Sequence, residues 1–193
     1  DSIGRVSFKL IAGGSSREEV NCLYVDKNGK IYITGESYSG KTYNIYVIRL
    51  NNNGRVDNYF GFPLERDINS DGVKDSAVVI DNIFTKNSDD VAHNIFVDSN
   101  GKVYVTGYSF KHRGYLNFWD IVERGAVYVI RLNSNGSLDN SFGNKGKIII
   151  NNIAGKNGAD VGKCLYVDSN GKVYVTGYSY NGKDYDMYVL KIE

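Results

Sequence analysis

Short apolar runs alternate with polar turns along this chain, and three pairs of runs are joined by the same turn. Residues 22–35, 94–107 and 164–177 each hold an apolar segment ending in Asp, an Asn-Gly-Lys turn and a second apolar segment ending in Thr-Gly. Asn-Gly supplies the positive φ angles that a tight hairpin needs. The pattern predicts three β-hairpins of one type, and such a repeat sets the architecture of a chain.

Two further apolar runs accompany each hairpin, which predicts four strands in a repeat. Several of these runs are apolar at successive positions, which indicates strands covered on both faces, as in sheets that stack on one another. We expect first strands at about 20–26, 92–98 and 162–168, second strands at 30–37, 102–109 and 172–179, third strands at 46–50, 128–132 and 188–192, and fourth strands at 6–11, 76–83 and 147–153.

The repeat is even once two insertions are removed. Asp26 and Asp98 are 72 residues apart, and Asp98 and Asp168 are 70 apart. Twelve extra residues precede the fourth strand of the first interval, and ten extra residues separate the second and third strands of the next, which leaves 60 in both. We therefore expect one domain over 1–193, with repeats at about 1–61, 62–143 and 144–193, interrupted at 62–75 and 110–126.

A four-stranded unit that repeats and is covered on both faces is typical of a β-propeller blade. The run RLNSNGSLDNSFG at 131–143, followed by residues 167–177, resembles the delta-sixty β-propeller repeat and is similar to SBBP and NHL-type repeats. The resemblance extends over essentially the whole chain, with a small departure at 55–61. It implies an all-β propeller of three four-stranded blades, and it implies little about function because its motif positions are structural.

The order of the predicted strands leaves the closure of the propeller open. The first apolar run, 6–11, is a fourth strand, so it must complete the last blade of this chain or a blade of a neighbouring chain. Propellers have about four to eight blades. Three arrangements are open: a homodimer that forms a six-bladed ring, an excerpt of a longer array, and a compact three-bladed monomer. Because the sequence starts at Asp1 instead of Met, we expect a processed or excised piece.

The composition of the chain disfavours some classes of partner and of scaffold. The 193 residues include 23 Lys and Arg and 22 Asp and Glu, a net charge of +1, which disfavours nucleic acid as a partner. No apolar run approaches the roughly 20 residues of a membrane-spanning helix, so we expect no membrane span. Two cysteines do not make a disulfide-rich scaffold. Cys22 and Cys164 hold the same repeat position, and we predict two small buried thiols.

The first insertion contains DINSDGVKD at 67–75, in which oxygen-bearing residues alternate. Oxygen ligands at positions 1, 3, 5 and 9, a backbone carbonyl at position 7 and a Gly at position 6 match a calcium loop. Position 12 is Val78 instead of the Glu of an EF-hand, and the flanks are strand-like, so the loop resembles those of FG-GAP and integrin-type propellers. We predict a structural Ca²⁺; the alternative is an acidic turn without metal. The ligands would be Asp67, Asn69, Asp71, Val73 and Asp75.

The second insertion, at 110–126, gathers aromatic and basic residues and holds the one Trp of the chain. Aromatic side chains with a few polar groups suit a partner surface. Loops between second and third strands should share one face of a propeller with loops between fourth and first strands. The alternative is a loop that folds back over the blade edges. The candidate partner-binding residues are His112, Arg113, Tyr115, Phe118 and Trp119.

These features favour a non-catalytic binding or scaffold module for a protein or glycan partner. A calcium loop favours a calcium-rich environment, so we expect a secreted or cell-surface protein. One alternative is a polysaccharide lyase or hydrolase, which needs two carboxylates or a base and its partner close together; its candidates are Asp89, Asp90, His93, Glu123 and Asp160. Another is a carbohydrate-binding module that uses the tyrosines after the second strands. These are Tyr38, Tyr108, Tyr178 and Tyr180.

Overall fold

The computed structural model describes residues 4–14, 17–111, 125–156 and 158–193, and in these ranges the regular structure is entirely β. Eleven of the twelve predicted strands are present, and a short additional strand, β4, occurs in the first insertion. The strands are β1 (Glu18–Val25), β2 (Ile31–Tyr38), β3 (Tyr43–Leu50), β4 (Phe62–Pro63), β5 (Ser76–Ile80), β6 (Ser88–Val97), β7 (Val103–Lys111), β8 (Gly125–Leu132), β9 (Lys147–Ile150), β10 (Asp160–Val167), β11 (Val173–Tyr180) and β12 (Tyr185–Ile192).

The strands form three antiparallel sheets, one for each repeat. The first sheet has the order β1-β2-β3-β5-β4, the second β6-β7-β8-β9 and the third β10-β11-β12. Each sheet therefore begins with the predicted hairpin. Neighbouring strands follow one another in the chain, except that β3 pairs with β5, and β4 lies beyond β5 at the edge of the first sheet. The second sheet has the four strands of the prediction, the first has one more, and the third has one fewer.

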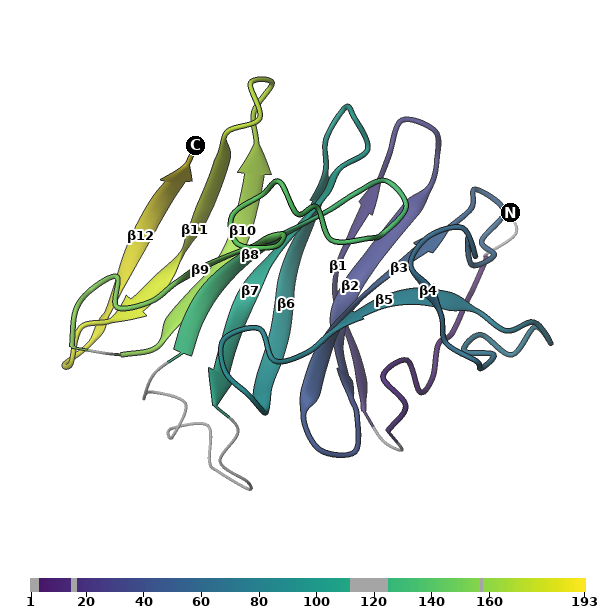
Figure 1. Cartoon of the computed structure of the whole chain (residues 1–193), viewed down its shortest axis with the longest axis horizontal. Coiled ribbons are helices and arrows are strands. Elements are labelled where there is room, and N and C mark those ends of the chain that lie inside the picture. The colour runs from purple at the N-terminus through teal and green to yellow at the C-terminus, as the bar shows by residue number, and fades with distance from the viewer. Residues whose placement is uncertain (1–3, 15–16, 112–124, 157) are drawn as a thin grey trace.

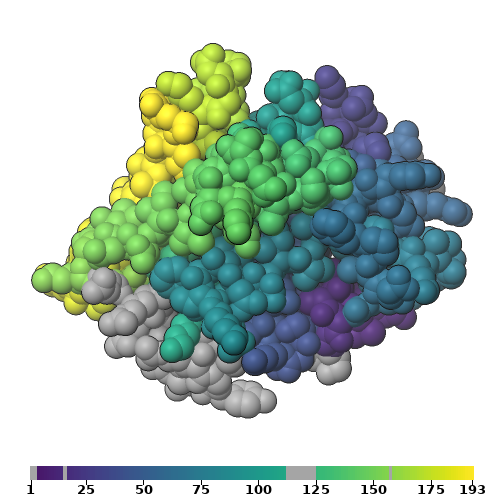
Figure 2. All heavy atoms as spheres, in the orientation of Figure 1, coloured from purple at the N-terminus to yellow at the C-terminus, as the bar shows by residue number. Residues whose placement is uncertain are grey.

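The three sheets stand side by side as an open arc, with the chain termini at opposite ends (Figure 1). The space-filling view agrees, with the N-terminal segment and β12 on opposite sides of the molecule (Figure 2). The turns of the three hairpins emerge along one edge of the arc, and the β2–β3 and β11–β12 turns emerge along the other (Figure 1). The all-β propeller architecture and the division of turns between two edges are confirmed.

The hydrophobic core lies between adjacent sheets. Ile45 and Val47 of β3 join Ile95 and Val97 of β6 in one cluster. A second cluster repeats this arrangement one sheet further along, with Val127 and Val129 of β8 beside residues of the third sheet. Each sheet thus buries one face on the next, which explains why the strands are apolar at successive positions. The third-sheet members of the second cluster include Leu165, Val167, Val173 and Val175.

The Thr-Gly at the end of each hairpin fits a bulge in its first strand. The pairing of β6 with β7 shifts between Ala92 and Asn94, which brings the Val91 carbonyl close to Gly107. A Cβ at Gly107 would overlap that carbonyl oxygen and crowd the Tyr128 hydroxyl. The Tyr128 hydroxyl donates to the same carbonyl at 2.9 Å. Corresponding tyrosines donate to the bulge in the other two sheets, so glycine is a structural requirement of the repeat.

Ion pairs explain the charged residues of the RLNxNG…D…FG motif. They connect the β6–β7 hairpin and β8 to the turn that follows β8. Lys102 Nζ and Arg131 Nε both donate to Asp139 Oδ2, at 2.7 and 2.8 Å. The Arg131 guanidinium also lies 4.6 Å from the centre of the Phe142 ring. The hydrogen bond that Lys102 donates to Asp139 holds the pKa of this carboxyl group well below its usual range. The charged groups of Lys102, Arg131 and Asp139 therefore stabilise the fold of the repeat.

Three sequence predictions differ from the structure. Residues 6–11 do not form a strand, and the N-terminal segment does not complete the last sheet of its own chain, because β12 lies at the far end of the arc. The segment instead packs Phe8 and Ile11 on the first sheet. Cys22 and Cys164 are free, but Cys22 is only half-buried and Cys164 is exposed, because Cys164 faces out from the last sheet.

Among the described residues, no helix meets the length and hydropathy of a membrane span.

Candidate functional site

The predicted calcium loop is a compact turn between β4 and β5, on the outer side of the first sheet (Figure 1). Asp67 Oδ2 accepts the Gly72 amide at 2.8 Å, and Asp67 Oδ1 accepts the Ser70 amide at 2.5 Å. Asn69 Oδ1 accepts from Asp71 N at 3.0 Å. The Gly72 amide is the main cause that lowers the pKa of Asp67. The side-chain oxygens of Asp67 and Asn69 therefore accept backbone amides of the turn itself.

Asp75 closes this loop at its buried end. It is 2% exposed, and its Oδ2 accepts the Ile68 amide at 2.9 Å. Burial raises the pKa of Asp75, and the negative charges of Asp71 and Asp67 contribute to the same shift. In the ranges that the structure describes, no three His, Cys, Asp or Glu side chains are gathered closely enough to hold a metal ion. The calcium site thus stays a prediction.

The predicted partner surface falls outside the described residues. His112, Arg113, Tyr115, Phe118 and Trp119 all belong to 112–124, as does the candidate catalytic residue Glu123. The described ends of this segment are Lys111, the last residue of β7, and Gly125, the first residue of β8. The insertion therefore joins β7 to β8, as predicted.

Asp90 and Asp160, two of the catalytic candidates, hold equivalent structural positions. Asp90 Oδ1 accepts the hydroxyls of Ser88 and Ser109 at 2.8 and 2.5 Å. Asp160 Oδ1 accepts the Ser179 hydroxyl at 2.5 Å. Both carboxylates are fully buried, and burial raises the pKa of Asp90 to about 6. Each carboxylate holds the start of its own sheet through these hydrogen bonds, and burial is the main cause that raises the pKa of both.

A row of polar side chains crosses the first strands of the three sheets at equivalent positions. Asn21 Nδ2 donates to the Ala92 carbonyl at 2.8 Å and so bridges the first and second sheets. His93 Nδ1 lies 2.8 Å from the Gly162 carbonyl and bridges the second and third sheets. Lys163 Nζ lies 3.3 Å from His93 Nε2. Burial lowers the pKa of His93, and Lys163 contributes to this shift.

Second-strand residues extend this row. Glu36 Oε2 accepts from Asn21 Nδ2 at 2.6 Å. Burial raises the pKa of Glu36 to about 8, and the neighbouring Glu19 carboxylate adds to the shift. The Tyr108 ring lies 5.1 Å from the His93 ring, and Lys163 Nζ lies 5.7 Å from the centre of the Tyr178 ring. We name the whole row the inner-strand belt; it consists of Glu19, Asn21, Glu36, His93, Tyr108, Lys163 and Tyr178.

Aromatic pairs flank the belt near the ends of the second strands. The Tyr38 and Tyr43 rings lie 5.2 Å apart in the first sheet. Tyr108 stacks on Phe110 at 5.6 Å in the second sheet. In the third sheet, Tyr185 contacts the rings of both Tyr178 and Tyr180. The partners in each pair belong to one sheet, and all of these tyrosines lie near the end of a second strand or the start of a third strand.

Sequence reasoning selected His93, Tyr108 and Tyr178 from the belt. It missed the polar residues Glu19, Asn21, Glu36 and Lys163. A comparison of equivalent positions in the three repeats could have identified these residues. Asn21, His93 and Lys163 hold one repeat position, and Glu36, Tyr108 and Tyr178 hold another. Variation at these two positions stands out against shared neighbours, and the fold brings both positions together.

Comparison with known proteins agrees with the fold. Residues 27–60 and 117–142 match a family described as a β-propeller domain of unknown function (DUF5122). The first matched segment covers the turn after β1, β2, β3 and the following turn, and the second includes β8 and the Arg131–Phe142 motif. None of the curated proteins compared with the chain matches it. The sheet topology and the family match together support a β-propeller repeat domain.

Proposed function

We propose that this chain is a non-catalytic β-propeller module that binds a glycan or protein partner at the inner-strand belt and its flanking aromatic pairs. The repeat itself is best described as of the delta-sixty, SBBP or NHL-like type, since its even 60-residue spacing and RLNxNG…FG motif support that assignment. One observation carries the functional proposal. Residues that differ between repeats converge on the belt, while the shared charges at Asp90, Asp139 and Asp160 are used inside the scaffold.

The chemistry of the belt suits a carbohydrate best. Tyr108 and Tyr178 supply aromatic surface, and His93, Glu36 and Lys163 supply polar groups close to it. Ligand sites of this kind combine aromatic walls with a few placed polar groups. Lys163 is exposed and projects from β10, so a ligand can reach it without rearrangement of the sheets.

We place the module outside the cell and give the 67–75 loop a structural Ca²⁺. Calcium loops of extracellular modules work at the high calcium concentrations found there. The bound ion would neutralise the carboxylates of Asp67, Asp71 and Asp75, whose mutual repulsion contributes to the raised pKa of Asp75. The ion would thereby rigidify the insertion between β4 and β5.

A panel of immobilised neutral, acidic and sulfated oligosaccharides tests the proposed function. We expect the wild-type chain to bind a subset of the panel, and Lys163→Ala and Tyr178→Ala each to weaken that binding at least about tenfold. Lys183→Ala is the matched control, because Lys183 lies in the exposed β11–β12 turn outside the belt. Its binding should equal that of the wild type.

Two results would contradict this proposal. Binding that survives both belt substitutions would show that the ligand sits elsewhere on the chain. Release of shortened oligosaccharides during incubation would favour the lyase or hydrolase alternative instead, since a binding module leaves its ligand intact. Mass spectrometry of the recovered oligosaccharides separates these outcomes.

A further inference from the structure

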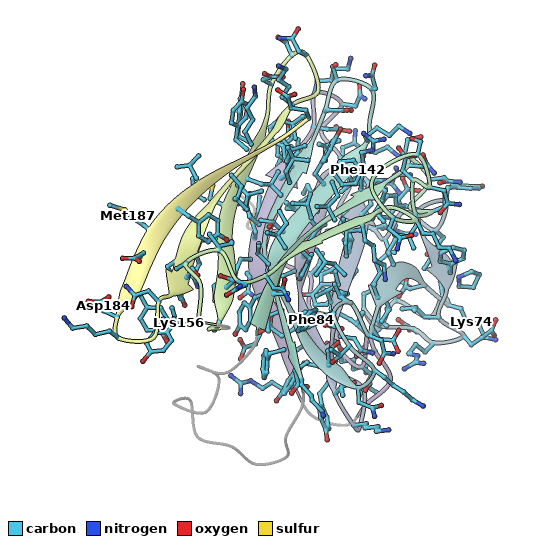
Figure 3. All side chains as sticks on the ribbon, turned by 60° about the vertical axis from the view of Figure 1, so that its left-hand side comes forward. Lys74, Phe84, Phe142, Lys156, Asp184 and Met187 are labelled. Atoms are coloured by element: carbon cyan, nitrogen blue, oxygen red, sulfur yellow. The ribbon has the colours of Figure 1, made fainter. Side chains whose placement is uncertain are left out.

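The third sheet leaves uncovered the face that the other two sheets bury. Met187 and Val189 of β12 are 91% and 72% exposed, and Met187 projects from the outer side of the arc (Figure 3). The equivalent residues of the first and second sheets are Ile45, Val47, Val127 and Val129, which are at most 1% exposed. In those sheets, the next sheet of the chain covers the face.

The first sheet exposes the opposite half of the same interface. Leu23 and Val25 of β1 are 60% and 52% exposed. Their equivalents in the later sheets are Ile95, Val97, Leu165 and Val167, which are at most 5% exposed because the preceding sheet covers them. The chain therefore carries both complementary surfaces of its internal sheet–sheet interface, one at each end of the arc.

The third sheet also has an unpaired edge where the others have a fourth strand. In the first sheet, β3 pairs with β5, and in the second, β8 pairs with β9. Within the described residues, β12 has β11 as its one strand partner. An unpaired edge offers free amides and carbonyls to another strand.

The N-terminal segment lies where a preceding fourth strand would lie. Phe8 and Ile11 pack against Ile33 and Ile48 of the first sheet. Ile80 and Ile83, which belong to and follow β5, pack in the same way against Val105 and Ile130 of the second sheet. The segment is thus already seated on the first sheet, and its missing neighbour is a third strand such as β12.

We propose that a second copy of this chain docks head to tail, so that the outer face of its third sheet covers the first sheet, and its β12 pairs with residues 6–11. The strand register follows from the internal sheets. Ile45 pairs with Ile80, and Val127 pairs with Ile150. The equivalent pair across the copies is Met187 with Phe8, and two residues further along it is Val189 with Val6.

In an assembly of two copies, the exposed first sheet and the exposed third sheet of each chain are both covered. A head-to-tail contact is heterologous, so it either closes into a ring or grows into an open filament. A ring of two copies has six sheets, within the range of about four to eight blades that propellers adopt, whereas three copies would give nine. The dimer therefore covers the exposed faces of the first and third sheets and gives β12 of each copy a second strand partner.

Aromatic contacts between first strands point to the same closure. Tyr24 and Phe96 lie 5.4 Å apart across the first and second sheets, and Phe96 and Tyr166 lie 5.7 Å apart across the second and third. Tyr166 ends this ladder and is 59% exposed. In the proposed dimer, Tyr24 of the second copy follows Tyr166 and continues the ladder around the ring.

Sedimentation analysis of the wild-type chain and three variants tests the proposal. We expect the wild type to sediment at twice the 21.5 kDa chain mass, and Val189→Asp and Leu23→Asp each to sediment as monomers. Both positions are solvent-exposed in the single chain, so its fold should tolerate the substitutions. Tyr59→Asp is the control, because Tyr59 is 91% exposed and lies between β3 and β4, outside the strands and the N-terminal segment that form the proposed contact; it should stay dimeric.

Mixing the two monomeric variants distinguishes a head-to-tail contact from a symmetric one. The Val189→Asp chain keeps a normal first sheet, and the Leu23→Asp chain keeps a normal third sheet. One intact interface should therefore form, and the mixture should contain a heterodimer. A wild-type chain that remains monomeric up to its highest soluble concentration would overturn the proposal, and so would a Leu23→Asp chain that still forms a dimer alone.

Discussion

At the scale of single residues, Glu36 is a carboxyl group whose ionisation the fold opposes. It is 8% exposed and lies beside the Glu19 carboxylate, while Asn21 donates a hydrogen bond to it. Burial and this neighbour raise its pKa from the usual 4.5 to about 8. The folded state therefore keeps Glu36 protonated near neutral pH, whereas the unfolded state does not.

We expect this difference to make stability fall as pH rises. A carboxyl with a raised folded-state pKa stabilises the fold fully below its unfolded pKa, and that contribution is lost as the pH passes through the folded value of about 8. Glu36→Gln removes this ionisation, so between pH 5 and pH 9 it should lose less stability than the wild type, by on the order of 2 kcal/mol. Urea unfolding at both pH values measures the difference.

Glu65→Gln serves as the control for this experiment. Glu65 is an exposed carboxylate that lies 2.6 Å from Lys74 Nζ in the first insertion, and its substitution should leave the pH dependence between pH 5 and pH 9 as in the wild type. An equal pH dependence for Glu36→Gln and the wild type would show that Glu36 ionises freely in the folded chain.

Residues that serve the repeat could be predicted from sequence, whereas most polar residues of the inner-strand belt could not. Gly107 appears in all three copies because a side chain there would meet the Val91 carbonyl, and repetition alone marks it as structural. Glu36 occurs in one copy only, and its pKa is raised by burial and by Glu19, which belongs to another strand. Sequence spacing does not reveal which side chains meet across strands.

At the scale of elements, the 67–75 loop carries the calcium prediction. Wild-type protein should bind one Ca²⁺ per chain in a calorimetric titration with calcium chloride, with a dissociation constant of about 10⁻⁴–10⁻³ M. Asp67→Asn with Asp71→Asn should weaken this binding at least about tenfold, because two of the charged oxygen ligands become neutral. Saturation with calcium should also raise the thermal unfolding midpoint of the wild type but not of the double variant.

A second acidic turn provides the matched control. Asp184 and Asp186 lie at the β11–β12 turn, where both carboxylates accept hydrogen bonds from Asn181. Asp184→Asn with Asp186→Asn removes the same number of charges outside the loop and should leave calcium binding intact. If both double variants bind calcium like the wild type, the 67–75 loop is an acidic turn without metal.

Element boundaries followed the sequence wherever pairing is local. The hairpins β1–β2, β6–β7 and β10–β11 were predictable because each depends on its own Asn-Gly turn. The prediction of a strand at 6–11 was wrong because the pairing of this segment is not local. Its apolar pattern is that of a fourth strand, but the β12 edge it would pair with lies at the other end of the arc, so local sequence could not determine its state.

At the scale of the whole molecule, the two ends of the arc are complementary surfaces. Equivalent first-strand positions already meet between adjacent sheets, because Asn94 Nδ2 lies 3.4 Å from Cys22 Sγ. Cys164 holds the same repeat position in the third sheet and is exposed. In a head-to-tail dimer, Cys164 of one copy would lie beside Cys22 of the second copy, as Cys22 lies beside Asn94 within the chain.

This pair of thiols gives the most direct test of the assembled propeller. A mixture of ¹⁴N- and ¹⁵N-labelled wild-type chains is treated with a short bismethanethiosulfonate linker, and the linked peptides are identified by mass spectrometry. We predict linked peptides that join Cys22 to Cys164 with mixed isotopic labels, and their loss in Cys22→Ser and in Cys164→Ser. Cys164–Cys164 links, or an absence of links between differently labelled chains, would contradict the account.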